Sequence, residues 1–135
     1  LSERVSDELF IERLRPKNKW SIAKALMDQS VVSGVGSYVK AEALWRARIS
    51  PHRAVSDIED LSLAIIKKCC QEVLVSSYSH GGASIKNYRR PDGSLGEYAS
   101  RFAVYNQKED PDGNLVVKEA TTDGRTTHWV PTVQF

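Results

Sequence analysis

The sequence predicts a mainly α-helical fold that carries a small antiparallel β finger, and three observations support this class. Residues 1–80 show helical periodicity in their apolar side chains. After Gly82 the composition changes to turn residues and short apolar runs. Near the C-terminus, Asp123-Gly124 separates two runs rich in Val and Thr. Because Asp-Gly supplies the positive-φ residues of a tight turn, this last pattern predicts a hairpin.

Three helices are expected before residue 52. The first spans Asp7–Arg15, and Pro16 ends it or follows it closely. The second runs from about Lys19 to Gln29, with one apolar face made of Trp20, Ala23, Leu26 and Met27. The segment Ser30–Gly36 breaks that pattern with two glycines. Helical periodicity then resumes until Pro51, through Tyr38, Ala41, Trp45 and Ile49.

A fourth, longer helix is expected to begin at a capping box. In Ser56-Asp57-Ile58-Glu59, Ser56 is predicted as the N-cap and Glu59 as the third helical residue. Gly81-Gly82 would end this helix. Its expected apolar stripe contains Ile58, Leu61, Ile65, Cys69 and Glu72 or Val73.

The last part of the chain is predicted to be loop and β finger. Residues 83–100 read as an ordered loop over the helices, because they hold turn residues and little periodicity. Short strands are expected at Phe102, Val104 and Leu115–Val117. The hairpin itself would pair Val116–Thr121 with Arg125–Val130. We therefore divide the chain into a helical part, 1–82, and a loop-and-finger part, 83–135.

Composition excludes several classes of protein. A chain of 135 residues with 41% apolar content can form one domain with a modest core. No apolar run approaches the roughly twenty residues of a membrane span, so no membrane association is expected. The only cysteines, Cys69 and Cys70, are adjacent. This excludes a disulfide framework and indicates a reducing, intracellular compartment.

The net charge of +2 is small, but the charges are unevenly distributed. Between Arg13 and Arg53 there are nine Lys or Arg residues and two acidic ones, whereas residues 106–135 contain three basic and five acidic residues. Such a basic region suits a polyanion such as DNA, whose phosphates supply most non-specific affinity. An ordinary solvated helix surface would explain the same charges equally well.

Two segments carry a resemblance to a known family. Leu26-Met27-Asp28-Gln29, Gly34-Val35-Gly36-Ser37 and Glu42 resemble a Leu-x-x-Gln…Gly-Ile-Gly-Asn…Glu pattern. The stretch from Gly124-Arg125-Thr126-Thr127 to Gln134 resembles Gly-Arg-Ser/Thr-Thr-x-x-Cys-Pro-x-Cys-Gln. Both patterns belong to the formamidopyrimidine-glycosylase/endonuclease-VIII (Fpg/Nei) family of DNA glycosylases. The first lies in its helix–two-turn–helix element and the second in its C-terminal finger.

Further matches follow between these two segments, in the order of the family. They are Gly81-Gly82-Ala83-Ser84-Ile85-Lys86, Pro91-Asp92-Gly93-Ser94-Leu95-Gly96 and Phe102-Ala103-Val104-Tyr105. The resemblance thus spans most of the chain. It implies a helix–two-turn–helix bundle with a finger packed on it.

The resemblance also implies that the finger holds no zinc. In the family two Cys-x-x-Cys pairs bind zinc, but here those positions are Asp112, Leu115, Val130 and Val133. We expect the zincless finger of some Nei-like members, stabilised by apolar packing of Leu115, Trp129, Val130 and Val133. His52, His80 and His128 are scattered and are expected to be structural or solvated. No cofactor is expected.

Arg125 is the principal candidate for DNA binding. It matches the family's finger arginine, which grips the backbone phosphates of the extruded nucleotide. A rigid hairpin tip also suits this role, because little side-chain entropy is left to lose. The alternative is a surface ion pair with Asp123 or Glu119.

The segment around Gly36 is the second expected contact with DNA. A helix that starts there offers free backbone N–H groups to a phosphate, and Gly36 lets the DNA approach closely. Ser37 stands where the family usually has Asn. Lys19 and Lys40 are expected to be further phosphate ligands. Other polar and aromatic side chains are expected to be structural: Glu42 and Gln29 between helices, Trp20 and Trp45 in the core.

No catalytic residue is expected in this segment. The resemblance implies a separate N-terminal β-sandwich that begins Pro-Glu and whose Pro amine is the nucleophile. This chain begins Leu1-Ser2-Glu3, and we expect it to be a domain of a longer enzyme. It would be the DNA-binding half of a bifunctional glycosylase/AP lyase of base excision repair. The alternative is a stand-alone, non-catalytic nucleic-acid-binding module.

The expected partners follow from this interpretation. They are damaged double-stranded DNA and the enzyme's own N-terminal catalytic domain, with the protein monomeric and located with genomic DNA, in the nucleus or cytoplasm. Because zincless members are Nei-like, the resemblance favours oxidised pyrimidines and hydantoins as lesions.

Overall fold

The computed structural model describes residues 5–32, 34–79 and 102–135. Its elements in chain order are α1 (Asp7–Leu14), η1 (Arg15–Lys17), α2 (Ile22–Leu26), α3 (Ser37–Ala47), η2 (Val55–Asp57), α4 (Asp60–Ser79), β1 (Val117–Ala120) and β2 (Thr126–Trp129). A helical fold with one two-stranded antiparallel sheet is the class predicted from the sequence. None of the helices in these ranges is both long and apolar enough to cross a bilayer.

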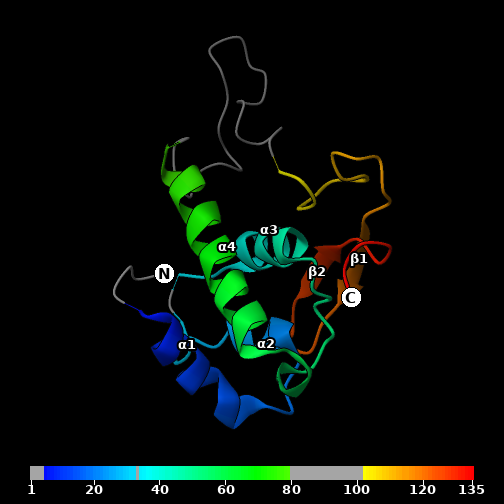
Figure 1. The fold of residues 1–135 in the computed structure, drawn as a ribbon. Coiled ribbons are helices and arrows are strands. Elements are labelled where there is room, and N and C mark those ends of the chain that lie inside the picture. The colour runs from blue at the N-terminus through cyan, green and yellow to red at the C-terminus, as the bar shows by residue number, and fades with distance from the viewer. Residues whose placement is uncertain (1–4, 33, 80–101) are drawn as a thin grey trace.

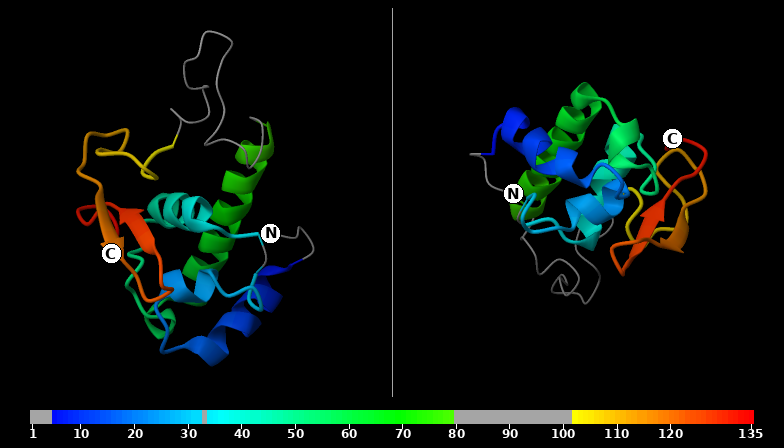
Figure 2. Two further views of the ribbon diagram at one scale, coloured as in Figure 1. Left: turned by 180° about the vertical axis from the view of Figure 1, so that it is seen from behind. Right: turned by 90° about the horizontal axis from the view of Figure 1, so that it is seen from below.

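The helix α3 lies between the long helix α4 and the β hairpin (Figure 1). The short helices α1 and α2 lie at one end of α4, and the hairpin packs on the side of α3 that faces away from α4 (Figure 2). Two apolar clusters follow from this arrangement. The larger joins the helices, and the smaller joins Ala41 of α3 to Ala103, Val104, Val116 and Val130.

The boundaries of the first helices differ from prediction for local reasons. The expected helix over 19–29 is only α2, because the Ser21 hydroxyl accepts a hydrogen bond from the backbone N–H of Lys24 and begins the helix there. The helix α1 ends at Leu14, and Pro16 follows it closely, as predicted, inside the 3-10 turn η1. The helix α3 ends before Pro51, because Arg48 takes a left-handed φ of 62°.

The predicted capping box is wrong, and the predicted stripe of the long helix is only partly right. Ser56 lies in the 3-10 turn η2, and Ile58 is extended, so that α4 begins at Asp60. Leu61 and Ile65 are 72% and 44% exposed. The face of α4 that packs on the core contains the predicted Cys69 and Val73, together with Leu63, Ile66 and Cys70.

The predicted end of this helix at Gly81-Gly82 lies outside the described residues. So do the 83–100 loop, the boundary between 1–82 and 83–135, His80, and the two motifs in 81–86 and 91–96.

The β finger is a hairpin with the predicted turn. Val117 pairs with Trp129 and Ala120 with Thr126, and Gly124 has a φ of +81° in the connecting loop. Phe102 and Val104 were expected to be strand residues, but Phe102 has no regular secondary structure and Val104 lies in a bend. Leu115 forms only an isolated bridge with Glu109.

Polar side chains stabilise the two turns that carry the family's zinc-ligand positions. The carboxylate of Asp110 accepts hydrogen bonds from the backbone N–H groups of Asp112 and Asn114, and from the Trp45 indole at 3.2 Å. Burial raises the pKa of Asp110, but hydrogen bonds from Asn114, Trp45 and Asp112 outweigh it and hold that pKa below its ordinary value. At the second turn, the side chain of Gln134 accepts from the Val130 N–H and donates to the Ile49 carbonyl.

The expected apolar packing of the finger is therefore only partly right. Val130 is fully buried and Val133 packs on the smaller cluster, whereas Leu115 is 66% exposed. Hydrogen bonds of Asp110 and Gln134 hold the turns. Over the described ranges, no group of three or more His, Cys, Asp or Glu side chains could hold a metal ion. The absence of zinc from the protein stays a prediction, which elemental analysis would check.

Candidate nucleic-acid interface

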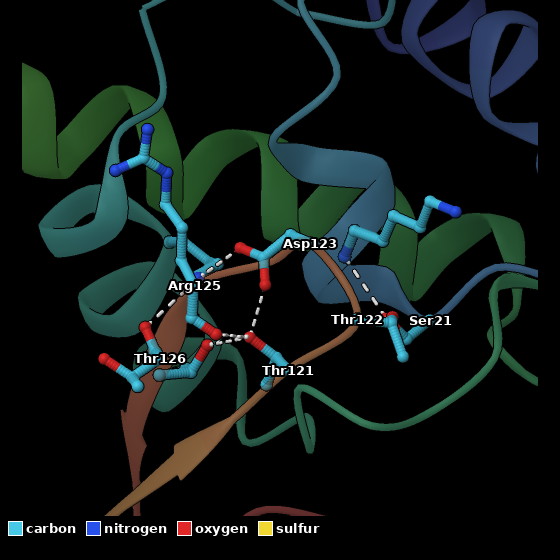
Figure 3. A network of polar contacts seen from close by, with 9 residues as sticks. Ser21, Thr121, Thr122, Asp123, Arg125 and Thr126 are labelled. Carbon is cyan, nitrogen blue, oxygen red and sulfur yellow. Dashed lines mark hydrogen bonds and ion pairs between the residues drawn. The ribbon is translucent and has the colours of Figure 1, made fainter.

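Arg125 lies in the loop between the two strands, and its side chain is exposed (Figure 3). In the close-up its guanidinium extends away from the polar network formed by Thr121 and Asp123. Of the two acids expected to compete for it, Asp123 pairs with Lys40 and Glu119 pairs with His52. Within 5–32, 34–79 and 102–135, no acid forms an ion pair with Arg125. The guanidinium is thus available to a ligand.

Glu119 is held away from Arg125 by two other donors. His52 Nε2 lies 2.5 Å from Glu119 Oε1, and the Trp129 indole donates to the same oxygen at 2.9 Å. These hydrogen bonds, that from His52 first, hold the pKa of Glu119 below its ordinary value.

The N-terminus of α3 begins directly after Gly36 and has no side-chain cap. Gly36 has a φ of −108°, which any residue can adopt. A Cβ placed on it would meet no other protein atom within 4 Å. Neither backbone strain nor crowding within the described chain therefore requires glycine at this position. Ser37, the first residue of α3, is half-buried beside it.

Lys40 was expected to contact phosphate, and the structure contradicts this. Its side chain is fully buried, and Nζ lies 2.6 Å from Asp123 Oδ2. Burial lowers the pKa of Lys40 despite the hydrogen bond and charge of Asp123. A lysine whose ammonium is withdrawn from solvent and already paired cannot serve as a surface phosphate ligand. Lys19, by contrast, is exposed.

Glu42 has a different role from the expected one. It does not join two helices but docks the finger on α3. Its carboxylate accepts hydrogen bonds from the backbone N–H groups of Ala103, Val104 and Tyr105 at 2.8–3.0 Å. Gln29, its expected companion, is exposed.

Trp20, which was expected in the core, forms a basic surface together with Lys17 and Lys24. Lys24 and Lys17 lie with Nζ 4.2 and 4.8 Å from the Trp20 ring centre. Trp20 is half-buried rather than in the core. A shallow pocket of about 220 Å³ connects this surface to the finger loop and is lined by Trp20, Lys24, Met27, Asp28, Thr122 and Asp123. Lys24 therefore lies beside the loop that carries Arg125, whereas Lys17 pairs with Asp28 at 3.7 Å. Trp45, the other expected core tryptophan, is also half-buried.

Comparison with known protein families covers nearly the whole chain. Residues 1–89 match the model of the formamidopyrimidine-DNA glycosylase H2TH domain. Residues 91–135 match that of the formamidopyrimidine-DNA glycosylase C-terminal domain.

Individual relatives agree with these models. The formamidopyrimidine-DNA glycosylase of Erythrobacter litoralis is 36% identical, over 98% of this chain and 51% of that protein. The enzyme of the same name from Cytobacillus firmus is 33% identical, over 99% of this chain and 49% of that protein. The chain thus spans about half the length of these curated relatives.

Solved structures agree with the fold. The MutM (Fpg) protein of Thermus thermophilus matches with a TM-score of 0.82 and 33% identity, over 99% of this chain and 52% of that one. A complex of Lactococcus lactis Fpg with abasic-site DNA matches with a TM-score of 0.80 and 29% identity, over 100% and 49%. The chain belongs to the formamidopyrimidine-DNA glycosylase family and corresponds to its H2TH and C-terminal domains.

Proposed function

We propose that this chain is the DNA-binding half of a glycosylase/AP lyase that excises oxidised bases. It clamps damaged duplex DNA while the base is flipped out of the helix. Extrusion of a base costs a few kcal/mol, which contacts to the neighbouring phosphates offset. The observation that carries this proposal is the exposed guanidinium of Arg125, which forms no ion pair with any described residue. It lies on a loop that the Lys40–Asp123 ion pair joins to α3.

Three features supply phosphate contacts in this proposal. Arg125 presents a planar set of donors, which suits a phosphate. The uncapped N-terminus of α3 at Gly36 and Ser37 presents backbone N–H groups with a favourable helix dipole. Lys19 adds an exposed charge. The open space at Gly36 supports the proposal, since it leaves room for the DNA backbone.

The chemistry itself lies with residues outside this chain. The family resemblance assigns the nucleophile to an N-terminal proline in another domain, and the described residues of this chain take the binding role. The Fpg structures with abasic-site DNA support damaged duplex DNA as the ligand. The narrower subclass, with its preference for oxidised pyrimidines and hydantoins, stays a prediction from the zincless finger, as do a monomeric state and a location with genomic DNA.

The affinity of the complete protein for duplex DNA is expected to fall steeply with salt. Each neutralised phosphate contributes about −0.9 to the slope of log affinity against log salt concentration. Arg125→Ala should make this slope less negative by about one phosphate contact, or about 0.9. The matched control is Arg46→Ala, which removes an exposed arginine that pairs with Glu72 on α4. An affinity insensitive to salt would contradict phosphate binding as its source.

A further inference from the structure

Lys40 and Asp123 form an ion pair that is withdrawn from solvent. The two side chains are 0% and 1% exposed, and their charged atoms lie 2.6 Å apart. Lys40 comes from the second turn of α3, whereas Asp123 comes from the finger loop, 83 residues later. The pair therefore joins the two elements that carry the proposed phosphate contacts.

The carboxylate of Asp123 also holds the backbone around Arg125. It accepts a hydrogen bond from the Thr121 hydroxyl (Figure 3), and the backbone N–H of Arg125 helps to lower its pKa. The Thr121 oxygen in turn lies 3.0 Å from the Arg125 carbonyl and 3.0 Å from the Thr127 hydroxyl. The carbonyl of Arg125 is thus held by the backbone N–H of Thr121 at 2.9 Å, and the hydroxyl of that threonine donates to Asp123, while the side chain of Arg125 stays outside the network.

The charges in this network are placed at a cost. Burial lowers the pKa of Lys40, and the positive charge of Arg125 lowers it further. Burial also raises the pKa of Asp123, but hydrogen bonds from Lys40, Thr121 and Arg125 outweigh it and hold that pKa below its ordinary value. Buried ion pairs contribute little net stability compared with apolar side chains of similar volume. Stability alone therefore does not explain why a charged pair is buried beside Arg125.

We propose that Lys40 and Asp123 are positioning residues, which fix Arg125 relative to the N-terminus of α3 so that both meet phosphates of one DNA backbone. This inference rests on the proposed DNA-binding function. Neither residue touches DNA. They affect affinity only by positioning Arg125. Residues with a general structural role would also affect affinity in the absence of the Arg125 side chain.

The test replaces the charged pair by an apolar one in the complete protein. The variant Lys40→Met/Asp123→Leu removes both charges and the hydrogen bond that joins Asp123 to Thr121 beside Arg125, and such apolar replacements are often neutral or stabilising. Affinity for a duplex with an abasic-site analogue is measured in the wild type, in this variant, in Arg125→Ala and in the triple variant. The matched control is Lys67→Met/Asp7→Leu, which removes the lysine–aspartate pair between α4 and α1.

A positioning role predicts effects that are not additive. Lys40→Met/Asp123→Leu should weaken binding about ten-fold and make the salt slope less negative, and should have no further effect once Arg125 is alanine. The control pair should leave affinity unchanged. If both changes weaken binding independently, so that their effects multiply in the triple variant, the inference is wrong. If Arg125→Ala alone leaves affinity unchanged, the proposed function fails instead.

A second variant decides the matter if the apolar pair does not fold. Asp123→Asn keeps the size of the side chain but removes its charge and weakens its hold on Lys40. It should weaken binding in the wild-type background and have no effect in the Arg125→Ala background. An equal loss of affinity in both backgrounds would overturn the inference.

Discussion

Replacing Arg125 by alanine in the complete protein is expected to slow excision of a damaged base from duplex DNA about ten- to a hundred-fold. The guanidinium is exposed and forms no ion pair within the described ranges, so its removal should leave the fold intact. What disappears is a charge-assisted grip on phosphates beside the flipped nucleotide, worth roughly 1.5–3 kcal/mol. The measurement is the single-turnover excision rate on a lesion-containing duplex, with thermal unfolding of the variant beside it.

The same variant should be less impaired on a second substrate. At a pre-formed abasic site no base can restack, so strand cleavage there should slow less than base excision. Arg46→Ala serves as the control, because it removes an equally charged side chain that pairs with α4. Excision at the wild-type rate by Arg125→Ala would mean that Arg125 is an ordinary surface residue.

Glu42→Ala is expected to have the largest effect on stability. Glu42 is 4% exposed, and its carboxylate accepts hydrogen bonds from three backbone N–H groups of the finger. Its removal leaves buried donors without an acceptor, each at a cost of about 1–3 kcal/mol. The free energy of unfolding should therefore fall by roughly 3–5 kcal/mol, and DNA affinity should fall with it because the finger carries Arg125.

Denaturant unfolding of the two proteins checks this expectation. Glu72→Ala is the matched control, since Glu72 is exposed and its ion pair with Arg46 on α3 is long, at 3.9 Å. The free energy of unfolding of this control should change by no more than about 0.5 kcal/mol. A loss for Glu42→Ala as small as that of the control would show that the finger is docked by other contacts.

Features set by neighbouring residues could be predicted from the sequence. The Asp123-Gly124 turn is an example, because the positive φ of Gly124 and the strand-forming residues around it are local properties. The exposure of Arg125 followed from its place beside that turn. The start of α3 at Ser37 likewise followed the two glycines in front of it.

Features set by distant residues could not be predicted in this way. Lys40 looks in the sequence like an ordinary surface lysine, and its burial depends on Asp123. Glu42 likewise finds its partners 61–63 residues later in the chain. The long helix α4 is apolar on more than one face, so periodicity does not decide between Leu61 and Leu63; packing on the core does.

The central claim is that the finger loop and the start of α3 grip the DNA backbone at an extruded nucleotide. Its most direct test is the dissociation constant of the complete protein for a duplex with an abasic-site analogue, measured against the same duplex intact. The account predicts tighter binding of the abasic duplex, by about ten-fold or more, and a clear loss of that preference in Arg125→Ala. Equal affinity for the two duplexes, or a preference that Arg125→Ala leaves unchanged, would contradict it.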